Sequence, residues 1–153
     1  MKLSSTLFLR VVIYLMGFGV LALCAALLAE GFPDDGKGFV WFFVIPYITV
    51  APFMIALWQT LKLLNYIDRG IAFSDRSVKA LKLIKYSALT ISGLYALILP
   101  VMYQAAQAED APGVMLIGLV LTFAPLAIAI FAAVIQKVLR SAIDIKSEND
   151  LTV

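Results

Sequence analysis

The chain has 153 residues, of which 63% are hydrophobic, and its formal net charge at pH 7 is +2. Soluble domains are about 45–50% apolar, so this composition favours one integral membrane domain over residues 1–153 and leaves no length for a second, soluble domain. The sequence contains no histidine and one cysteine, Cys24. These counts exclude a disulfide within the chain, argue against a cysteine-rich metal site and remove the commonest general base.

Four long apolar stretches follow one another along the chain, separated by short polar segments. They cover approximately residues 7–29, 40–64, 87–106 and 113–138. A helix needs about 20 residues to cross a hydrocarbon core about 30 Å thick, so each stretch can span a membrane. The sequence therefore predicts an all-α membrane protein, a four-helix bundle of transmembrane helices with cytoplasmic helical extensions.

Basic residues are distributed unevenly among the polar segments. All of them except Lys37 fall in or next to the N-terminal segment, the connection between the second and third stretches, or the C-terminal segment: Lys2, Arg10, Lys62, Arg69, Arg76, Lys79, Lys82, Lys85, Lys137, Arg140 and Lys146. Cytoplasmic segments of membrane proteins carry the excess of Lys and Arg. This distribution predicts that both termini and the middle connection lie in the cytoplasm.

Prolines interrupt the second and fourth apolar stretches, at Pro46, Pro52 and Pro125. Each proline removes a backbone donor and tends to kink a helix. Two interpretations remain open. The prolines can belong to bent packing helices, since proline is frequent in membrane helices, or they can act as hinges beside a ligand cleft. Pro46, Pro52 and Pro125 are therefore our candidate hinges.

The middle connection predicts a turn followed by an amphipathic helix over about residues 75–86. Gly70 is a favourable residue after a helix end, and Ser74 is a favourable N-cap. Beyond them, three apolar and three basic residues each recur every third position: Val78, Leu81 and Ile84, and Lys79, Lys82 and Lys85. This helix can lie at the lipid surface with its lysines on phosphates, or extend the bundle and offer a basic face to a partner.

Catalytic motifs are missing from the sequence. It contains no Walker loop, no nucleophile elbow and no HExxH motif, and no acidic residue lies deep in an apolar stretch. Arg10 lies about one turn inside the first stretch and can snorkel back to the head groups. The sequence therefore predicts a protein that is not an enzyme, with no catalytic residue, cofactor or metal site.

Two segments resemble a known family. The first is LNYIDRGIAFS at residues 64–74, followed by SVKALKLI at residues 77–84, and the second is SENDLTV at residues 147–153. Together they resemble the bacterial domain-of-unknown-function family 2975, whose members look like small four-span membrane proteins with a Gly-x-x-Phe-Ser turn. The resemblance implies a bacterial inner membrane and brings no biochemical activity. It also implies a cytoplasmic helix-turn-helix regulator as a partner, because many members look to be encoded beside one.

The inner face is the predicted site of contact, because it combines helices, clustered charge and a distinctive C-terminus. Candidate contacts to a partner or to anionic lipid head groups are Arg69, Ser74, Arg76, Lys79, Lys82, Lys85, Asp150 and Val153. We expect the C-terminal tail to dock on residues 68–74.

Two functions remain open at this stage. The first is a non-enzymatic interaction or regulatory protein acting through its cytoplasmic face. The alternative is a small transporter or channel subunit with a path between the proline-bent spans. A second copy of the chain is a further candidate partner, whereas direct binding of nucleic acid is not expected because the basic residues flank membrane helices and form no reading motif.

Overall fold

The computed structural model describes residues 2–31 and 40–151, and these residues form four helices. They are α1 (Lys2–Glu30), α2 (Val40–Asp68), α3 (Asp75–Ala108) and α4 (Pro112–Leu151). All four are long and apolar enough to cross a membrane, and no strand occurs in the described ranges. The predicted all-α fold with four candidate transmembrane helices is therefore confirmed.

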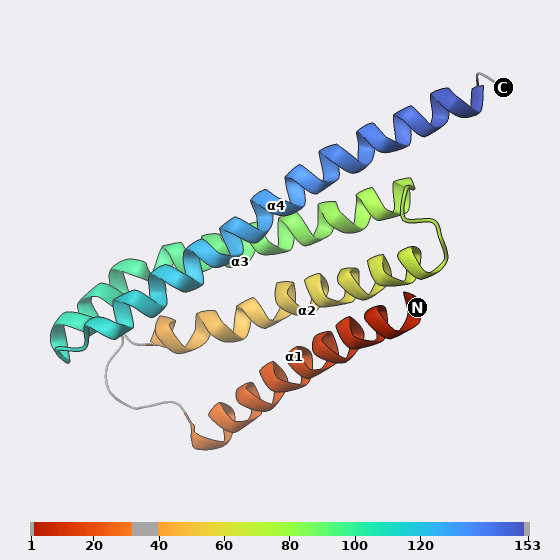
Figure 1. The fold of residues 1–153 in the computed structure, drawn as a ribbon. Coiled ribbons are helices and arrows are strands. Elements are labelled where there is room, and N and C mark those ends of the chain that lie inside the picture. The colour runs from red at the N-terminus through yellow and green to blue at the C-terminus, as the bar shows by residue number, and fades with distance from the viewer. Residues whose placement is uncertain (1, 32–39, 152–153) are drawn as a thin grey trace.

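Consecutive helices run in opposite directions and form an open bundle (Figure 1). Within the described residues, close backbone approaches join only α1 to α2, α2 to α3, and α3 to α4, and the packing is most extensive between α3 and α4. The helix α3 therefore lies between α2 and α4, and α1 rests on α2 alone. The start of α1, the turn between α2 and α3, and the last turns of α4 all lie at the same end of the molecule.

The core lies where α2, α3 and α4 pack together. Its buried centre consists of Ile45, Tyr95, Ile98 and Met102. At Gly118 of α4 a Cβ atom would stand 2.7 Å from the Met102 sulfur, so this glycine allows α3 and α4 to approach closely, as small residues do between membrane helices.

Both α3 and α4 continue beyond their apolar stretches as unbroken helices. The basic segment at residues 75–86 and the third apolar stretch form one helix, α3. Helix α4 continues to Leu151, whose side chain is 83% exposed, and its last turns project past the other helices (Figure 1). The prediction that the tail docks on residues 68–74 is wrong as far as Leu151, because the chain extends its helix instead. Val153 lies outside the described residues.

Helix α1 is the most loosely attached element. In its second half, every residue from 21 to 30 is exposed except the half-buried Cys24. Its buried residues, Thr6, Ile13 and Gly17, all belong to the first half. The acidic loop predicted after this helix falls in residues 32–39, outside the described ranges.

Candidate functional site

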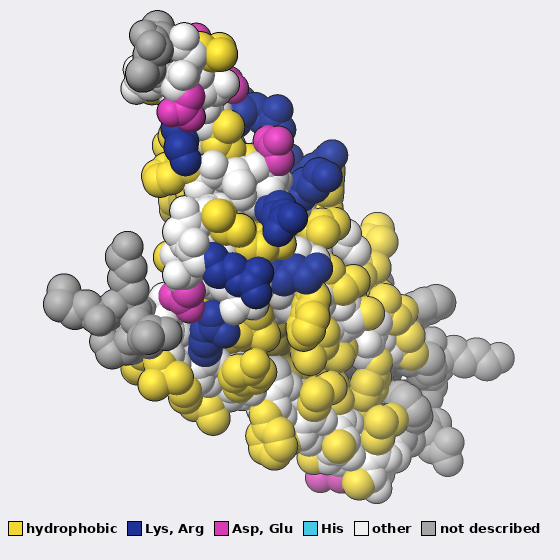
Figure 2. Space-filling view, turned by 90° about the vertical axis from the view of Figure 1, so that its right-hand side faces the viewer, with side chains coloured by type: hydrophobic (Ala, Val, Ile, Leu, Met, Phe, Trp, Pro, Cys, Tyr) yellow, Lys and Arg dark blue, Asp and Glu magenta, His cyan; other side chains and the backbone are white. Residues whose placement is uncertain are grey.

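Basic side chains gather at the end of the molecule that holds the turn between α2 and α3 (Figure 2). We call this set the basic end: Arg69, Arg76, Lys79, Lys82, Lys85, Lys137, Arg140 and Lys146. All of its members are exposed except Lys85, which is half-buried. Among the other predicted contacts, Ser74 is half-buried and Asp150 is exposed. The structure thus brings the basic residues of α3 and α4 onto neighbouring helices at one end.

Asp75 and Asp144 do not neutralise basic residues of this set. The spacing of Asp75 with Lys79, and of Arg140 with Asp144, is suited to i,i+4 ion pairs. Neither ion pair forms in the described part of the chain. All four side chains are exposed, and ion pairs between exposed side chains gain little free energy.

The turn between α2 and α3 is well ordered by backbone hydrogen bonds. Gly70 has a φ of +75° and donates to the carbonyl of Ile67 at 3.1 Å, while Ile71 donates to the carbonyl of Tyr66 at 2.9 Å. This pair of bonds is the Schellman motif, which favours glycine at the left-handed position. Ser74 occupies the predicted N-cap position, but its hydroxyl donates to the Ile71 carbonyl at 2.7 Å instead of capping α3.

Two lysines of the basic end converge on one aromatic ring. The Nζ atoms of Lys82 and Lys85 lie 6.0 Å and 5.1 Å from the centroid of the Tyr86 ring. Lys85 also donates to the Oε1 atom of Gln136 in α4 at 3.2 Å. This contact joins α3 to α4 at the level where the basic residues begin, and no spacing in the sequence could have indicated it.

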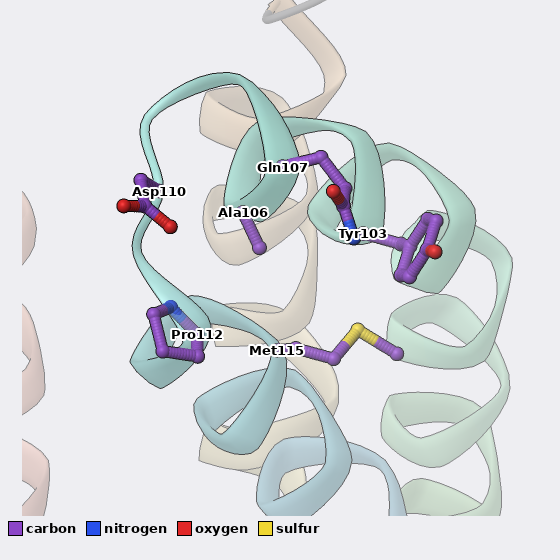
Figure 3. Close-up of a pocket in the computed structure, with 6 residues that line it drawn as sticks. All are labelled: Tyr103, Ala106, Gln107, Asp110, Pro112 and Met115. Atoms are coloured by element: carbon purple, nitrogen blue, oxygen red, sulfur yellow. The ribbon is translucent and has the colours of Figure 1, made fainter.

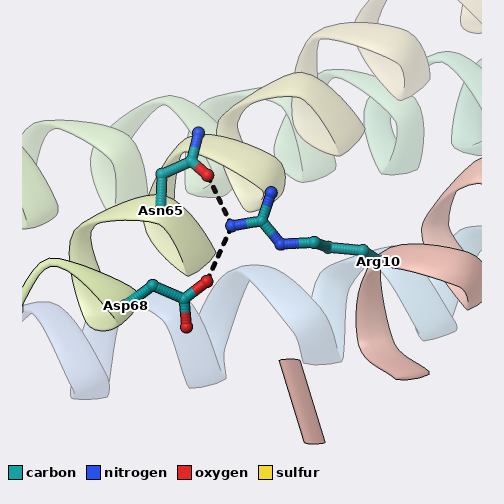
Figure 4. A network of polar contacts seen from close by, with 3 residues as sticks. All are labelled: Arg10, Asn65 and Asp68. Carbon is teal, nitrogen blue, oxygen red and sulfur yellow. Dashed lines mark hydrogen bonds and ion pairs between the residues drawn. The ribbon is translucent and has the colours of Figure 1, made fainter. Parts of the chain in front are cut away.

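Arg10 forms a polar network with the end of α2 (Figure 4). Its Nη2 atom lies 2.8 Å from the Asp68 carboxylate and also donates to the Asn65 side chain. Arg10 therefore pairs with Asp68 at the end of α2. This attraction is favourable because two partly buried charges interact more strongly than charges in water.

The candidate hinge prolines lie close to hydroxyl groups that join neighbouring helices. Near Pro46, the Thr49 hydroxyl donates to the Pro46 carbonyl at 2.8 Å and lies 3.2 Å from the Tyr95 hydroxyl. Because Thr49 has one proton to donate, Tyr95 is the donor between the two. The Thr49–Tyr95 contact links α2 to α3, whereas the bond to Pro46 lies within α2.

A similar link joins α3 to α4 beside Pro125. The Ser92 hydroxyl donates to the Thr122 carbonyl at 2.7 Å, and the Thr122 hydroxyl donates to the Gly118 carbonyl at 2.9 Å. The polar groups around both prolines are thus used in helix packing, which favours the interpretation of bent packing helices. Pro52 is half-buried inside α2.

An open pocket of about 270 Å³ lies at the opposite end of the molecule, where α3 turns into α4 (Figure 3). Its lining residues are Tyr103, Ala106, Gln107, Asp110, Pro112 and Met115. Asp110 is the one charged residue among them. The described residues contain no group of three or more acidic or cysteine side chains that could hold a metal ion.

The chain belongs to the family described as "Protein of unknown function (DUF2975)", which matches residues 23–153. It is 51% identical, over 160 aligned positions that cover both chains completely, to "Uncharacterized membrane protein YoaS" of Bacillus subtilis (strain 168). The predicted family resemblance is thus confirmed, and the chain is a membrane protein of an uncharacterized family. No solved structure shows significant similarity to it.

Proposed function

We propose that this protein is a non-enzymatic interaction protein of the bacterial inner membrane, which binds a soluble cytoplasmic partner through the basic end. The observation that carries the proposal is the gathering of eight basic side chains on α3, α4 and the adjoining turn. Segments rich in Lys and Arg remain in the cytoplasm. We therefore expect the basic end to lie on the cytoplasmic side of the membrane, where a soluble regulator can reach it.

The geometry of the basic end suits recognition of an acidic protein surface. Arg76 and Lys79 lie in the first turns of α3, and Arg140 lies on the exposed extension of α4. Because regular helices carry these charges, their spacing is set before a partner arrives. Complementary charge raises association rates and selects the partner. A cytoplasmic helix-turn-helix regulator, the partner that the family resemblance implies, is the first to test.

A non-enzymatic role is supported by the chemistry of the sequence. The chain has no histidine and no motif that supplies a nucleophile with a base. The Arg10–Asp68 ion pair links two helices, which gives these charges a structural use. The proposal therefore assigns no catalytic residue.

Charge reversal of three exposed residues tests the proposal. The regulator is co-expressed with the wild-type protein or with a variant carrying Arg76→Glu, Lys79→Glu and Arg140→Glu, and the amount recovered with the membrane protein is measured at several salt concentrations. We expect recovery to be lost in the variant and to fall with salt in the wild type, since salt screens exposed charges.

The matched control is Arg76→Lys, Lys79→Arg and Arg140→Lys, which keeps every charge and should keep the regulator. Equal recovery with the charge-reversed protein would show that the basic end is not the contact surface. Membrane insertion and helicity of both variants are measured alongside, so that loss of binding is not confused with loss of folding.

The alternative is a transporter or channel subunit with a path between the proline-bent helices. Such a path would have to pass between α2 and α4, but α3 packs between these helices (Figure 1). No observation therefore favours this function. A flux assay in liposomes that detects ion or solute movement would revive it.

A further inference from the structure

Two exposed tyrosines on α3 are separated by about the thickness of a hydrocarbon core. Tyr86 is 50% exposed and Tyr103 is 53% exposed, and no charged residue lies between them in the sequence. At 1.5 Å per residue they are separated by about 26 Å along the helix, close to the thickness of a hydrocarbon core. Tyrosine is enriched at both membrane–water interfaces. Tyr86 therefore lies at the level where head groups begin.

The basic residues nearest that level are Lys82 and Lys85. Their Nζ atoms lie 6.0 Å and 5.1 Å from the centroid of the Tyr86 ring, within or at the limit of a cation–π contact. The contact of Lys85 with Gln136 at 3.2 Å brings α4 to the same depth. Two ammonium groups are thus held over one interfacial ring, at the depth of lipid phosphates.

Both ammonium groups retain donors that point to no acidic side chain. An ammonium has three N–H donors and no acceptor, and Lys85 uses one of them on Gln136. Within residues 2–31 and 40–151, neither Lys82 nor Lys85 forms an ion pair with a carboxylate. The remaining donors suit the oxygens of a phosphate.

We propose that Lys82, Lys85 and Tyr86 of α3, together with Gln136 of α4, form a binding site for the phosphate of an anionic phospholipid. Lysine binds phosphate as a point charge, and the Gln136 amide adds two donors. Tyr86 supports the ammonium groups from the membrane side. Lys82 and Lys85 belong to the basic end, but the site needs no soluble partner, and Arg76, Lys79 and Arg140, which the partner test reverses, take no part in it.

Lipid binding to the full-length protein tests the site directly. The protein is stripped of lipid in detergent and titrated with dioleoyl phosphatidylglycerol or dioleoyl phosphatidylcholine, and native mass spectrometry counts the bound lipids. We expect the wild type to prefer phosphatidylglycerol. A lysine near an anionic surface contributes about fivefold in affinity. In the double variant Lys82→Gln, Lys85→Gln, the ratio of the affinity for phosphatidylglycerol to that for phosphatidylcholine should therefore fall about 25-fold.

The matched control is Lys79→Gln with Lys146→Gln, which removes the same charge from exposed positions farther from Tyr86. It should retain the wild-type preference. Equal losses in the two double variants would mean diffuse attraction to the whole basic end, which overturns the proposal.

Substitutions of the ring separate this site from a general effect on folding. Tyr86→Phe keeps the aromatic face and should preserve the preference, whereas Tyr86→Leu should weaken it while leaving the helicity unchanged. An excess of inorganic phosphate distinguishes the source of the ligand. If free phosphate displaces phosphatidylglycerol completely, the site takes soluble phosphate and the assignment to a lipid is wrong.

Discussion

Replacing Arg10 by Met should detach α1 from α2. Removing one partner of a buried ion pair costs about 3–5 kcal/mol, and an exposed pair contributes about 0–1 kcal/mol. The Arg10 and Asp68 side chains are 27% and 18% exposed, so solvent screens part of their attraction. We therefore expect Arg10→Met to lower the free energy of unfolding by about 2 kcal/mol, between these limits.

The assay is a double-mutant cycle with Arg10→Met and Asp68→Asn, in which sodium dodecyl sulfate unfolds the protein in mixed micelles and circular dichroism follows the helicity. One oxygen of Asp68 is buried without a hydrogen-bond partner, so loss of Arg10 leaves the carboxylate poorly satisfied. The double variant should lose about 1 kcal/mol less unfolding free energy than the sum of the losses in the two single variants. Additive effects would refute the argument that these two residues stabilise each other.

Two pairs of substitutions and one pair of fusions test the turn, the core and the orientation. Gly70→Ala should lower the free energy of unfolding by about 1 kcal/mol because φ is +75°, whereas Gly19→Ala, with equally open space around it in a regular helix, should cost nothing. Ser77→Ala should raise the free energy of unfolding by about 1 kcal/mol, because the Ser77 hydroxyl is buried without a partner. Ser92→Ala should lower the free energy of unfolding by a similar amount, because it removes an interhelical bond. Equal effects within either pair would contradict these assignments. Alkaline phosphatase fused at Glu109 should be active and a fusion at the C-terminus inactive, and the reverse result would invert the proposed orientation.

The number and type of the helices could be predicted from the sequence because lipid leaves the backbone few alternatives. A chain crossing hydrocarbon must satisfy its own hydrogen bonds, so long apolar stretches such as residues 113–138 have to be helical. The order of packing could not be predicted in the same way. Whether α4 contacts α2 or α3 depends on local fit, such as the close approach at Gly118, and lipid-facing and helix-facing side chains are equally apolar.

For the candidate site, the sequence predicted which residues are charged and exposed but not which of them meet. The gathering of Lys79 and Lys82 followed from their spacing on one helix. The Arg10–Asp68 pair was missed, although a weak signal existed: opposite charges lie near the same membrane level in consecutive spans. The Lys85–Gln136 contact has no such signal, because it depends on how far α4 slides along α3.

The interhelical polar links explain why the basic end should behave as one rigid unit. Thr49 with Tyr95 joins α2 to α3, while Ser92 with Thr122 and Lys85 with Gln136 join α3 to α4. Every one of these links involves α3, whereas α1 contacts α2 alone. Detachment of α1 therefore leaves the surface of α3 and α4 in place. It follows that Arg10→Met, while destabilising α1, should leave the preference for phosphatidylglycerol unchanged, and a lost preference would show that α1 contributes to the basic end.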